Sequence, residues 1–173
     1  MDILILRLIH IVAGAFWVGA LFTQVLFLQP TAIALGPDAG KYQLHLIRRS
    51  RFPTAVLASA AITVVAGIVL LWMSTNGFDP ELLFDVSRLG FTVGGVIAIL
   101  TFGVGSLYVY PRTLRVAGTM GGAMGEGRAP NPDEQAQLAQ LRGELARSGW
   151  VVLTGVALAV AAMATARYWG VVL

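Results

Sequence analysis

One histidine and one arginine lie inside an apolar segment, where they could carry chemistry. Arg7 and His10 belong to a run that is apolar from about Ile3 to Leu28, and at about 100° per residue they share one helix face. Ionisable side chains inside a membrane helix are costly and usually functional. Because a neutral imidazole ligates metals, His10 is the candidate metal ligand. The alternative is a neutral histidine hydrogen-bonded to a carbonyl or hydroxyl of a neighbouring helix.

Three arginines at one predicted end of the chain suggest an anionic partner. Arg88 and Arg167 belong by topology to the same layer as Arg7, and arginine pairs well with carboxylates. A b-type haem meets these requirements, because its iron takes one histidine, its ring is apolar and its two propionates can pair with arginines. For each arginine the alternative is snorkelling to the headgroups.

The predicted haem pocket uses small residues near the depth of His10. Gly14 and Trp17 continue its stripe and would shape the pocket, and glycines of other spans would leave room for the ring. Those glycines are Gly67, Gly94 and Gly95. We expect His10 to be the only metal ligand, with Arg7, Gly14, Trp17, Arg88 and Arg167 as further cofactor-binding residues; no catalytic residue is assigned.

A second axial ligand is not expected. His45 follows the inner end of the first span, which lies about 27 Å from His10 along the helix, whereas two axial nitrogens on one iron are roughly 4 Å apart. Met163 has the right depth but points away from the predicted stripe of its span. Copper is disfavoured because Cu(I) sites prefer clusters of cysteine, methionine and histidine, and the chain has no cysteine.

The elements that position these residues are predicted membrane helices. The 173 residues are 57% hydrophobic and 12% charged, against roughly 25% charged residues in soluble domains. Four segments have the roughly 20 apolar residues that a span requires. The fold class is therefore an all-α integral membrane four-helix bundle, a single domain with almost nothing outside the bilayer. The spans are predicted near residues 3–28, 53–73, 89–110 and 149–170.

The connections differ in composition. The glycine-rich segment 116–132 is expected to be mobile. Asn131, Pro132, Asp133 and Glu134 form a helix-start signature, which predicts a helix near residues 132–147. This helix is expected either on the membrane surface or running straight into the fourth span.

The basic residues predict the orientation. Nine of the twelve Lys and Arg residues flank the first and third connections, and three lie at the other end. The positive-inside rule therefore places both termini outside and the basic connections in the cytoplasm. The modest net charge of +3 is explained by these loops, and no nucleic-acid partner is expected.

Each predicted span also has a stripe of small and polar residues, which we expect to face the bundle interior. The stripe of the first span is Arg7, His10, Gly14, Trp17, Leu21 and Gln24. The others are Ser59, Thr63 and Ala66; Arg88, Thr92, Gly95, Ile99, Ser106 and Tyr110; and Thr154, Ala161, Thr165 and Tyr168.

The first span, RLIHIVAGAFWVGALFTQVLFLQP, resembles the first helix of the HemJ-type protoporphyrinogen oxidases and the related CopD-like membrane proteins. The shared pattern is His-x3-Gly-x2-Trp-x-Gly, starting at His10. KYQLHLIRRSRFPTAVLASAAITVVAGIVLLW and LRGELARSGWVVLTGVALAVA are similar to later parts of the same group. The resemblance implies that His10 binds haem b. Those enzymes carry a lysine and a Tyr-His pair in the third helix, where this chain has Arg88 and LYVYPR, so it implies haem binding more than protoporphyrinogen oxidation.

Together these features predict a multi-pass, haem-binding protein of the cell (plasma or inner) membrane. If it is an enzyme, it is a haem-dependent oxidoreductase that moves electrons to or from a quinone or a porphyrin. The alternatives are a cofactor-free accessory or structural subunit and a small transporter. The expected partners are the lipid bilayer and, in a homodimer or larger complex, other membrane subunits.

Overall fold

The computed structural model describes residues 2–36 and 39–172, and every regular element in these ranges is helical. Four helices are long and apolar enough to cross a membrane, so the chain is an all-α membrane bundle, as the sequence predicts. They extend over Ile3–Leu35, Phe52–Ser74, Val86–Gly125 and Pro132–Tyr168.

Most of these long helices consist of several segments. The first joins α1 (Ile3–Thr23), the π-helical turn η1 (Gln24–Leu28) and α2 (Gln29–Leu35). The second is α4 (Phe52–Ser74), preceded by α3 (Ala39–Leu44) and the π-helical turn η3 (His45–Arg49) and followed by α5 (Pro80–Leu83). The third joins α6 (Val86–Val104), the π-helical turn η4 (Gly105–Val109) and α7 (Tyr110–Gly125). The fourth joins α8 (Pro132–Thr165), the 3₁₀ turn η5 (Ala166–Tyr168) and α9 (Trp169–Val172).

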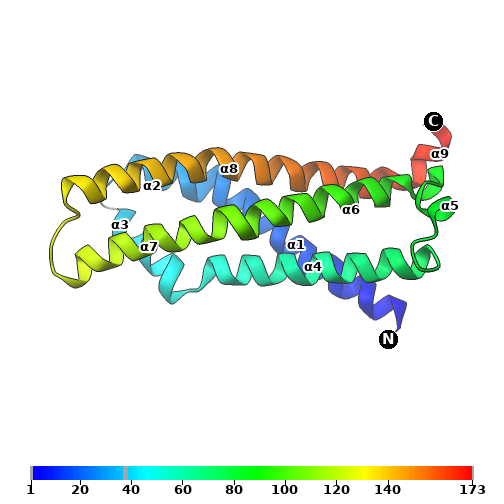
Figure 1. Ribbon diagram of the computed structural model, residues 1–173, viewed down its shortest axis with the longest axis horizontal. Coiled ribbons are helices and arrows are strands. Elements are labelled where there is room, and N and C mark those ends of the chain that lie inside the picture. The colour runs from blue at the N-terminus through cyan, green and yellow to red at the C-terminus, as the bar shows by residue number, and fades with distance from the viewer. Residues whose placement is uncertain (1, 37–38, 173) are drawn as a thin grey trace.

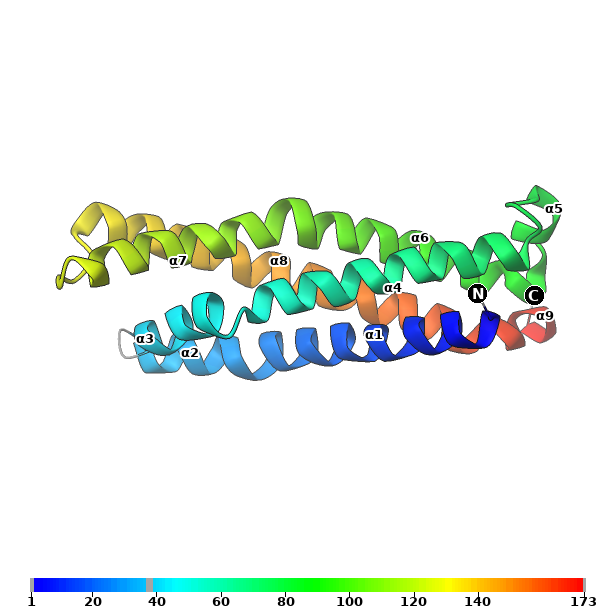
Figure 2. The same ribbon diagram turned by 90° about the horizontal axis from the view of Figure 1, so that it is seen from below.

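The bundle has two distinct ends (Figure 1). Both chain termini lie at one end with α5 and α9, and we call this end the terminal half. The opposite end, with α2, α3, α7 and the start of α8, is the basic half, because it holds nine of the twelve Lys and Arg residues. The most extensive helix contacts are those of α1 with α4 and of α6 with α8. Figure 2 shows α4 lying between α1 and α6, and α8 completes the bundle by packing on α1 as well.

Two prolines lie inside the long helices, each after a π-helical turn. Proline has no N–H to donate to the carbonyl four residues earlier, and its ring displaces that carbonyl. η1 begins six residues before Pro30 and η4 begins six residues before Pro111. Each turn absorbs the lost hydrogen bond, so the helix continues past the point near which the sequence predicts its end.

The long helices extend further than the predicted spans. The helix Val86–Gly125 has 40 residues, about 60 Å at 1.5 Å per residue, whereas the hydrocarbon core is about 30 Å thick. This helix is therefore longer than one crossing of the hydrocarbon core requires, and it extends well beyond the predicted span 89–110.

The segment expected as a mobile glycine-rich loop is largely helical. Residues up to Gly125 belong to α7, and only the stretch between α7 and α8 is a connection. Val116 and Met120 are buried against Leu138 and Leu141 of α8. This packing outweighs the low helix propensity of the glycines.

The helix predicted near residues 132–147 runs into the fourth span without a break, which is the second of the two expected alternatives. It begins with a capping box, in which the Glu134 N–H donates to the Asn131 side chain and the Asn131 N–H donates to Glu134, both at 2.8 Å. In the adjoining connection, hydrogen bonds from the Arg128 guanidinium to Glu134 and Glu126 raise the pKa of Arg128.

The predicted stripes have different outcomes. Ser59, Thr63 and Ala66 are buried, as expected. The stripe of the fourth span is wrong: Thr154, Ala161, Thr165 and Tyr168 are exposed, as is Ile99 of the third. The Thr165 hydroxyl donates to the Ala161 carbonyl at 2.7 Å. A threonine satisfied by its own helix needs no neighbour and can face lipid.

Candidate functional site

His10 lies where α1 packs against α4. Its ring nitrogen Nδ1 is 2.8 Å from the carbonyl oxygen of Thr63. A carbonyl can only accept, so Nδ1 is the donor and Nε2 of the neutral ring keeps its lone pair. A histidine that donates through one nitrogen to a backbone carbonyl is also the arrangement that orients a metal ligand.

A glycine makes this bond possible. A Cβ at Gly67 would be 2.9 Å from Cε1 of His10 and 3.2 Å from Nδ1. Thr63 and Gly67 are four residues apart and therefore adjacent on one face of α4. The missing side chain at Gly67 lets the imidazole reach the Thr63 carbonyl.

The other residues predicted to bind a cofactor are not joined to His10 by hydrogen bonds among the described residues. Arg7 is exposed and Arg88 is half-buried. The Arg167 guanidinium lies 4.6 Å from the ring centre of Tyr168. Trp17 is buried in a cluster with Ala60 and Val156. Gly14 is close to Thr63 and contributes to the α1–α4 contact, with 3.3 Å from a built Cβ to Thr63 Cγ2.

The space predicted for a porphyrin is largely filled. The space left by the missing side chain of Gly67, which we call the histidine notch, holds the His10 ring. At Gly94 the space is occupied by Met163, because a Cβ there would be 2.7 Å from its Cγ. Of the three glycines predicted to make room for the ring, only Gly95 has open space beside it. Residues 2–36 and 39–172 contain no group of three His, Cys, Asp or Glu side chains that could hold a metal ion. The imidazole thus has the orientation of an axial ligand, while side chains of His10 and Met163 occupy the gaps at two of the three glycines predicted to make room for the ring.

An apolar pocket lies in the other half of the bundle. It has a volume of about 460 Å³, and it is lined by residues of α1, η1, α2, α3, η3, α4, α6, η4, α7 and α8. Gln24 lies on η1, Ser106 on η4 and Phe52 at the start of α4. The two π-helical turns before Pro30 and Pro111 thus both contribute to its wall. Pockets for small ligands typically have volumes of about 300–1,000 Å³.

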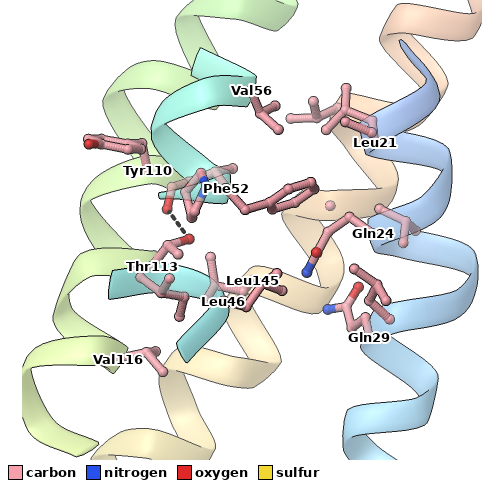
Figure 3. Close-up of a pocket in the computed structure, with 18 of the residues that line it drawn as sticks. Leu21, Gln24, Gln29, Leu46, Phe52, Val56, Tyr110, Thr113, Val116 and Leu145 are labelled. Atoms are coloured by element: carbon pink, nitrogen blue, oxygen red, sulfur yellow. Dashed lines mark hydrogen bonds between the residues drawn. The ribbon is translucent and has the colours of Figure 1, made fainter. Parts of the chain in front are cut away.

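One polar atom in this pocket has no partner. The oxygen Oε1 of Gln24 is buried and accepts no hydrogen bond from any described residue. Figure 3 shows the amide groups of Gln24 and Gln29 pointing into the space between η1 and Phe52. Buried polar atoms are nearly always hydrogen-bonded, and leaving one unpaired costs about 1–3 kcal/mol. Gln24 therefore marks the place where a ligand could supply a donor.

The pocket is polar at one end. Trp17, Ala60 and Phe102 line its apolar end. Gln43 and Arg142 lie at the other, where the Arg142 guanidinium donates to Oε1 of Gln43 at 3.2 Å. No acidic residue is found in the described lining. Such a gradient suits a molecule with a tail and a head.

Sequence reasoning identified Gln24 only as a member of a stripe and gave no role to Gln29 or Gln43. The available signal is a glutamine six residues before a proline within an apolar helix. His45, set aside as an axial ligand, is exposed in the basic half.

Comparisons with family models, with curated proteins and with solved structures give no match. The likeness of the first span to HemJ-type and CopD-like proteins therefore stays a prediction from the motif at His10. What is established is a multi-pass, four-helix membrane bundle with a histidine notch in its terminal half and an amphipathic pocket toward its basic half.

Proposed function

We propose that this protein binds one amphiphilic molecule in the pocket of the basic half. The observation that carries the proposal is the unpartnered, buried Oε1 of Gln24 in a pocket with apolar walls. The tail lies beside Trp17 and Phe102, and the head reaches Gln24 and Gln29.

The head group is a neutral one that carries a hydroxyl. Oε1 of Gln24 requires a donor, and the amide nitrogen beside it requires an acceptor. A hydroxyl provides both, as in a long-chain alcohol or a quinol. A ketone or an ester can only accept, so neither would satisfy Oε1.

Three probes with the same tail test this choice: hexadecanol, methyl hexadecanoate and hexadecanoic acid. Binding to the purified protein is measured by native mass spectrometry and by the shift in melting temperature. We expect hexadecanol to bind most tightly. Tighter binding of the acid would show instead that Arg142 recognises a carboxylate, and no binding of any probe would mean that the pocket is a packing void.

A matched pair of variants locates the bound alcohol. Gln24→Leu removes the unpartnered oxygen, whereas Gln137→Leu makes the same change at an exposed position of α8 away from the pocket. The loss of a hydrogen bond of 0.5–1.5 kcal/mol should weaken hexadecanol binding by about 2- to 12-fold in Gln24→Leu. Equal affinities of the two variants would contradict the assignment of Gln24.

The second candidate function is binding of haem b at His10. The Nδ1 bond to Thr63, which leaves Nε2 as the ligating atom, favours it. Bound haem would supply one-electron chemistry, and the protein would be an oxidoreductase acting on a quinone or porphyrin. A ring at this depth would have to displace Met163 from Gly94, which counts against it.

An absorption spectrum decides this candidate. The purified protein, expressed with added haem precursor, should show a Soret band that His10→Ala abolishes and that His45→Ala, at an exposed position, retains. A colourless protein leaves His10 with a packing role in a cofactor-free membrane subunit. Neither result affects the alcohol-binding test.

We further propose that the basic half faces the cytoplasm and both termini face outward in the plasma or inner membrane, because of the excess of Lys and Arg in the basic half. The chain has no cysteine, so any maleimide labelling of a single-cysteine variant comes from the introduced residue. In intact cells a membrane-impermeant maleimide should label Asn76→Cys, beside α5, and leave Gly127→Cys unlabelled. The reverse pattern would invert the orientation.

A further inference from the structure

A second hollow lies on the basic half, outside the amphiphile pocket. It has a volume of about 640 Å³ and lies between η3, the start of α4 and α7. Its lining combines two arginines, one threonine and three apolar residues. These are Arg48, Arg51, Thr54, Ile47, Leu114 and Ala117.

The two arginines carry charge that no carboxylate balances in the described part of the chain. The ion pairs found there involve Arg112 and Arg128, and neither Arg48 nor Arg51 takes part in one. Both are exposed. The hollow is therefore positively charged and accessible.

The Arg48 guanidinium packs against α7 at a position that lacks a side chain. A Cβ at Gly121 would be 2.6 Å from Cζ and Nη1 of the Arg48 guanidinium. The guanidinium thus lies flat against the helix at Gly121. This seat fixes one side of the hollow and links η3 to α7.

The depth of the hollow corresponds to the lipid headgroups. α4 starts at Phe52 and has 23 residues, about 35 Å, which matches a hydrocarbon core of about 30 Å. A bilayer crossed by α4 would have its boundary near Arg51 and Thr54, which flank the start of the helix. The apolar Leu114 is 45% exposed beside them, as suits a surface in contact with lipid.

From these observations we infer that the hollow binds the phosphate headgroup of an anionic phospholipid, with Arg48 and Arg51 contacting the phosphate. Arginine forms strong paired hydrogen bonds to phosphate, and basic pockets between membrane helices bind anionic headgroups. The apolar walls favour a lipid over a free anion. This inference does not rest on the proposed amphiphile pocket, although Ile47 lines both spaces.

The test compares lipids on the purified full-length protein. Melting temperature and lipid adducts in native mass spectra are measured with phosphatidylglycerol and with phosphatidylcholine of the same acyl chains. We expect phosphatidylglycerol to stabilise the protein more and to form the more persistent adduct, with a difference that shrinks at high salt. Inorganic phosphate alone should have no effect, and a shift equal to that of the lipid would overturn the lipid assignment.

Three variants make the test specific to this hollow. Arg48→Gln/Arg51→Gln should reduce the preference for phosphatidylglycerol at least about fivefold, because it removes both positive charges that favour a lipid with a net negative charge over a zwitterionic one. Gly121→Ala should weaken it without changing the net charge, by displacing the Arg48 guanidinium. Arg49→Gln, in the same segment but outside the lining, should retain it. An unchanged preference in the folded Arg48→Gln/Arg51→Gln variant would refute the site, as would an equal loss in Arg49→Gln.

Discussion

The helices pack closely in the terminal half of this bundle, whereas in the basic half they leave a pocket between them. In the terminal half, glycines let the helices approach until backbone touches backbone: a Cβ at Gly90 would be 2.7 Å from the Ala162 carbonyl and from Cα of Ala166. In the basic half, π-helical turns before Pro30 and Pro111 border a pocket of about 460 Å³. Small residues thus allow tight packing in the terminal half, which we call the closed half. The basic half, which we call the open half, has its pocket beside the two π-helical turns.

This comparison bears on function because a ligand needs space. His10, the most conspicuous chemical group in the sequence, lies in the closed half, and its ring occupies the notch at Gly67. Gln24 is an uncharged residue of the open half, and its side-chain oxygen accepts no hydrogen bond within residues 2–36 and 39–172. Burial and an unmet hydrogen bond therefore indicate a ligand more directly than residue type does.

The largest expected effect is on the glycine contact of the closed half. Gly90→Ala should destabilise the protein by about 3 kcal/mol, the upper end for overpacking, because the nearest atoms are two backbone atoms and the Cβ of Ala166, none of which can rotate aside. The control is Gly95→Ala in the same helix, where nothing lies within 4 Å; it should be neutral or stabilising by up to about 1 kcal/mol. Denaturant unfolding in detergent measures both. Equal effects would remove the distinction between closed and open packing.

The next effect concerns the histidine notch. Gly67→Ala should cost about 1–2 kcal/mol, because a methyl group would press on the His10 ring. In a His10→Ala background the same change should cost much less, because the ring is gone. A double-mutant cycle of unfolding free energies gives the coupling. Additive effects would show that the ring does not occupy the notch.

A smaller effect of opposite sign is expected in the open half. Gln24→Leu should stabilise the ligand-free protein by about 1 kcal/mol, because it removes a buried unpaired acceptor. For a chain of this size that corresponds to about 2–4 °C in melting temperature. If Gln24→Leu stabilises the protein and also weakens hexadecanol binding, then Gln24 serves ligand binding at a cost in stability. A destabilised variant would mean that Gln24 is bonded after all.

The smallest effect is at the start of α8, which is held by its own side chains. Asn131→Ala removes the cap and should cost about 0.5–1 kcal/mol. We expect faster amide exchange in the first turn of α8 and little change in global unfolding. Asn131→Asp, which keeps the capping oxygen, should behave like the wild type. A large global loss would mean that the basic half and the membrane bundle unfold as one unit.

The sequence alone could predict the buried stripe at Ser59, Thr63 and Ala66, because small polar residues recur there at helical spacing. It could not predict the fourth stripe, since Thr165 bonds within its own helix. Instead, Ala162 of α8 and Ala166 of η5 face Gly90. Nor did it identify α7 as a helix, because the many glycines of this segment predict a loop. The buried residues Val116, Ala117 and Met120 nevertheless lie at helical spacing.

Hydropathy and charge are properties of the chain itself, so the sequence by itself determined the four membrane helices and the concentration of Lys and Arg at one end of the bundle. The tertiary structure alone decided how each helix is rotated about its axis. It also decided that the His10 ring packs at Gly67 and that the side-chain oxygen of Gln24 is buried without a partner among the described residues. Each depends on which neighbour approaches which face, and residues such as Thr63 and Gly67 meet His10 only after α1 and α4 have packed together.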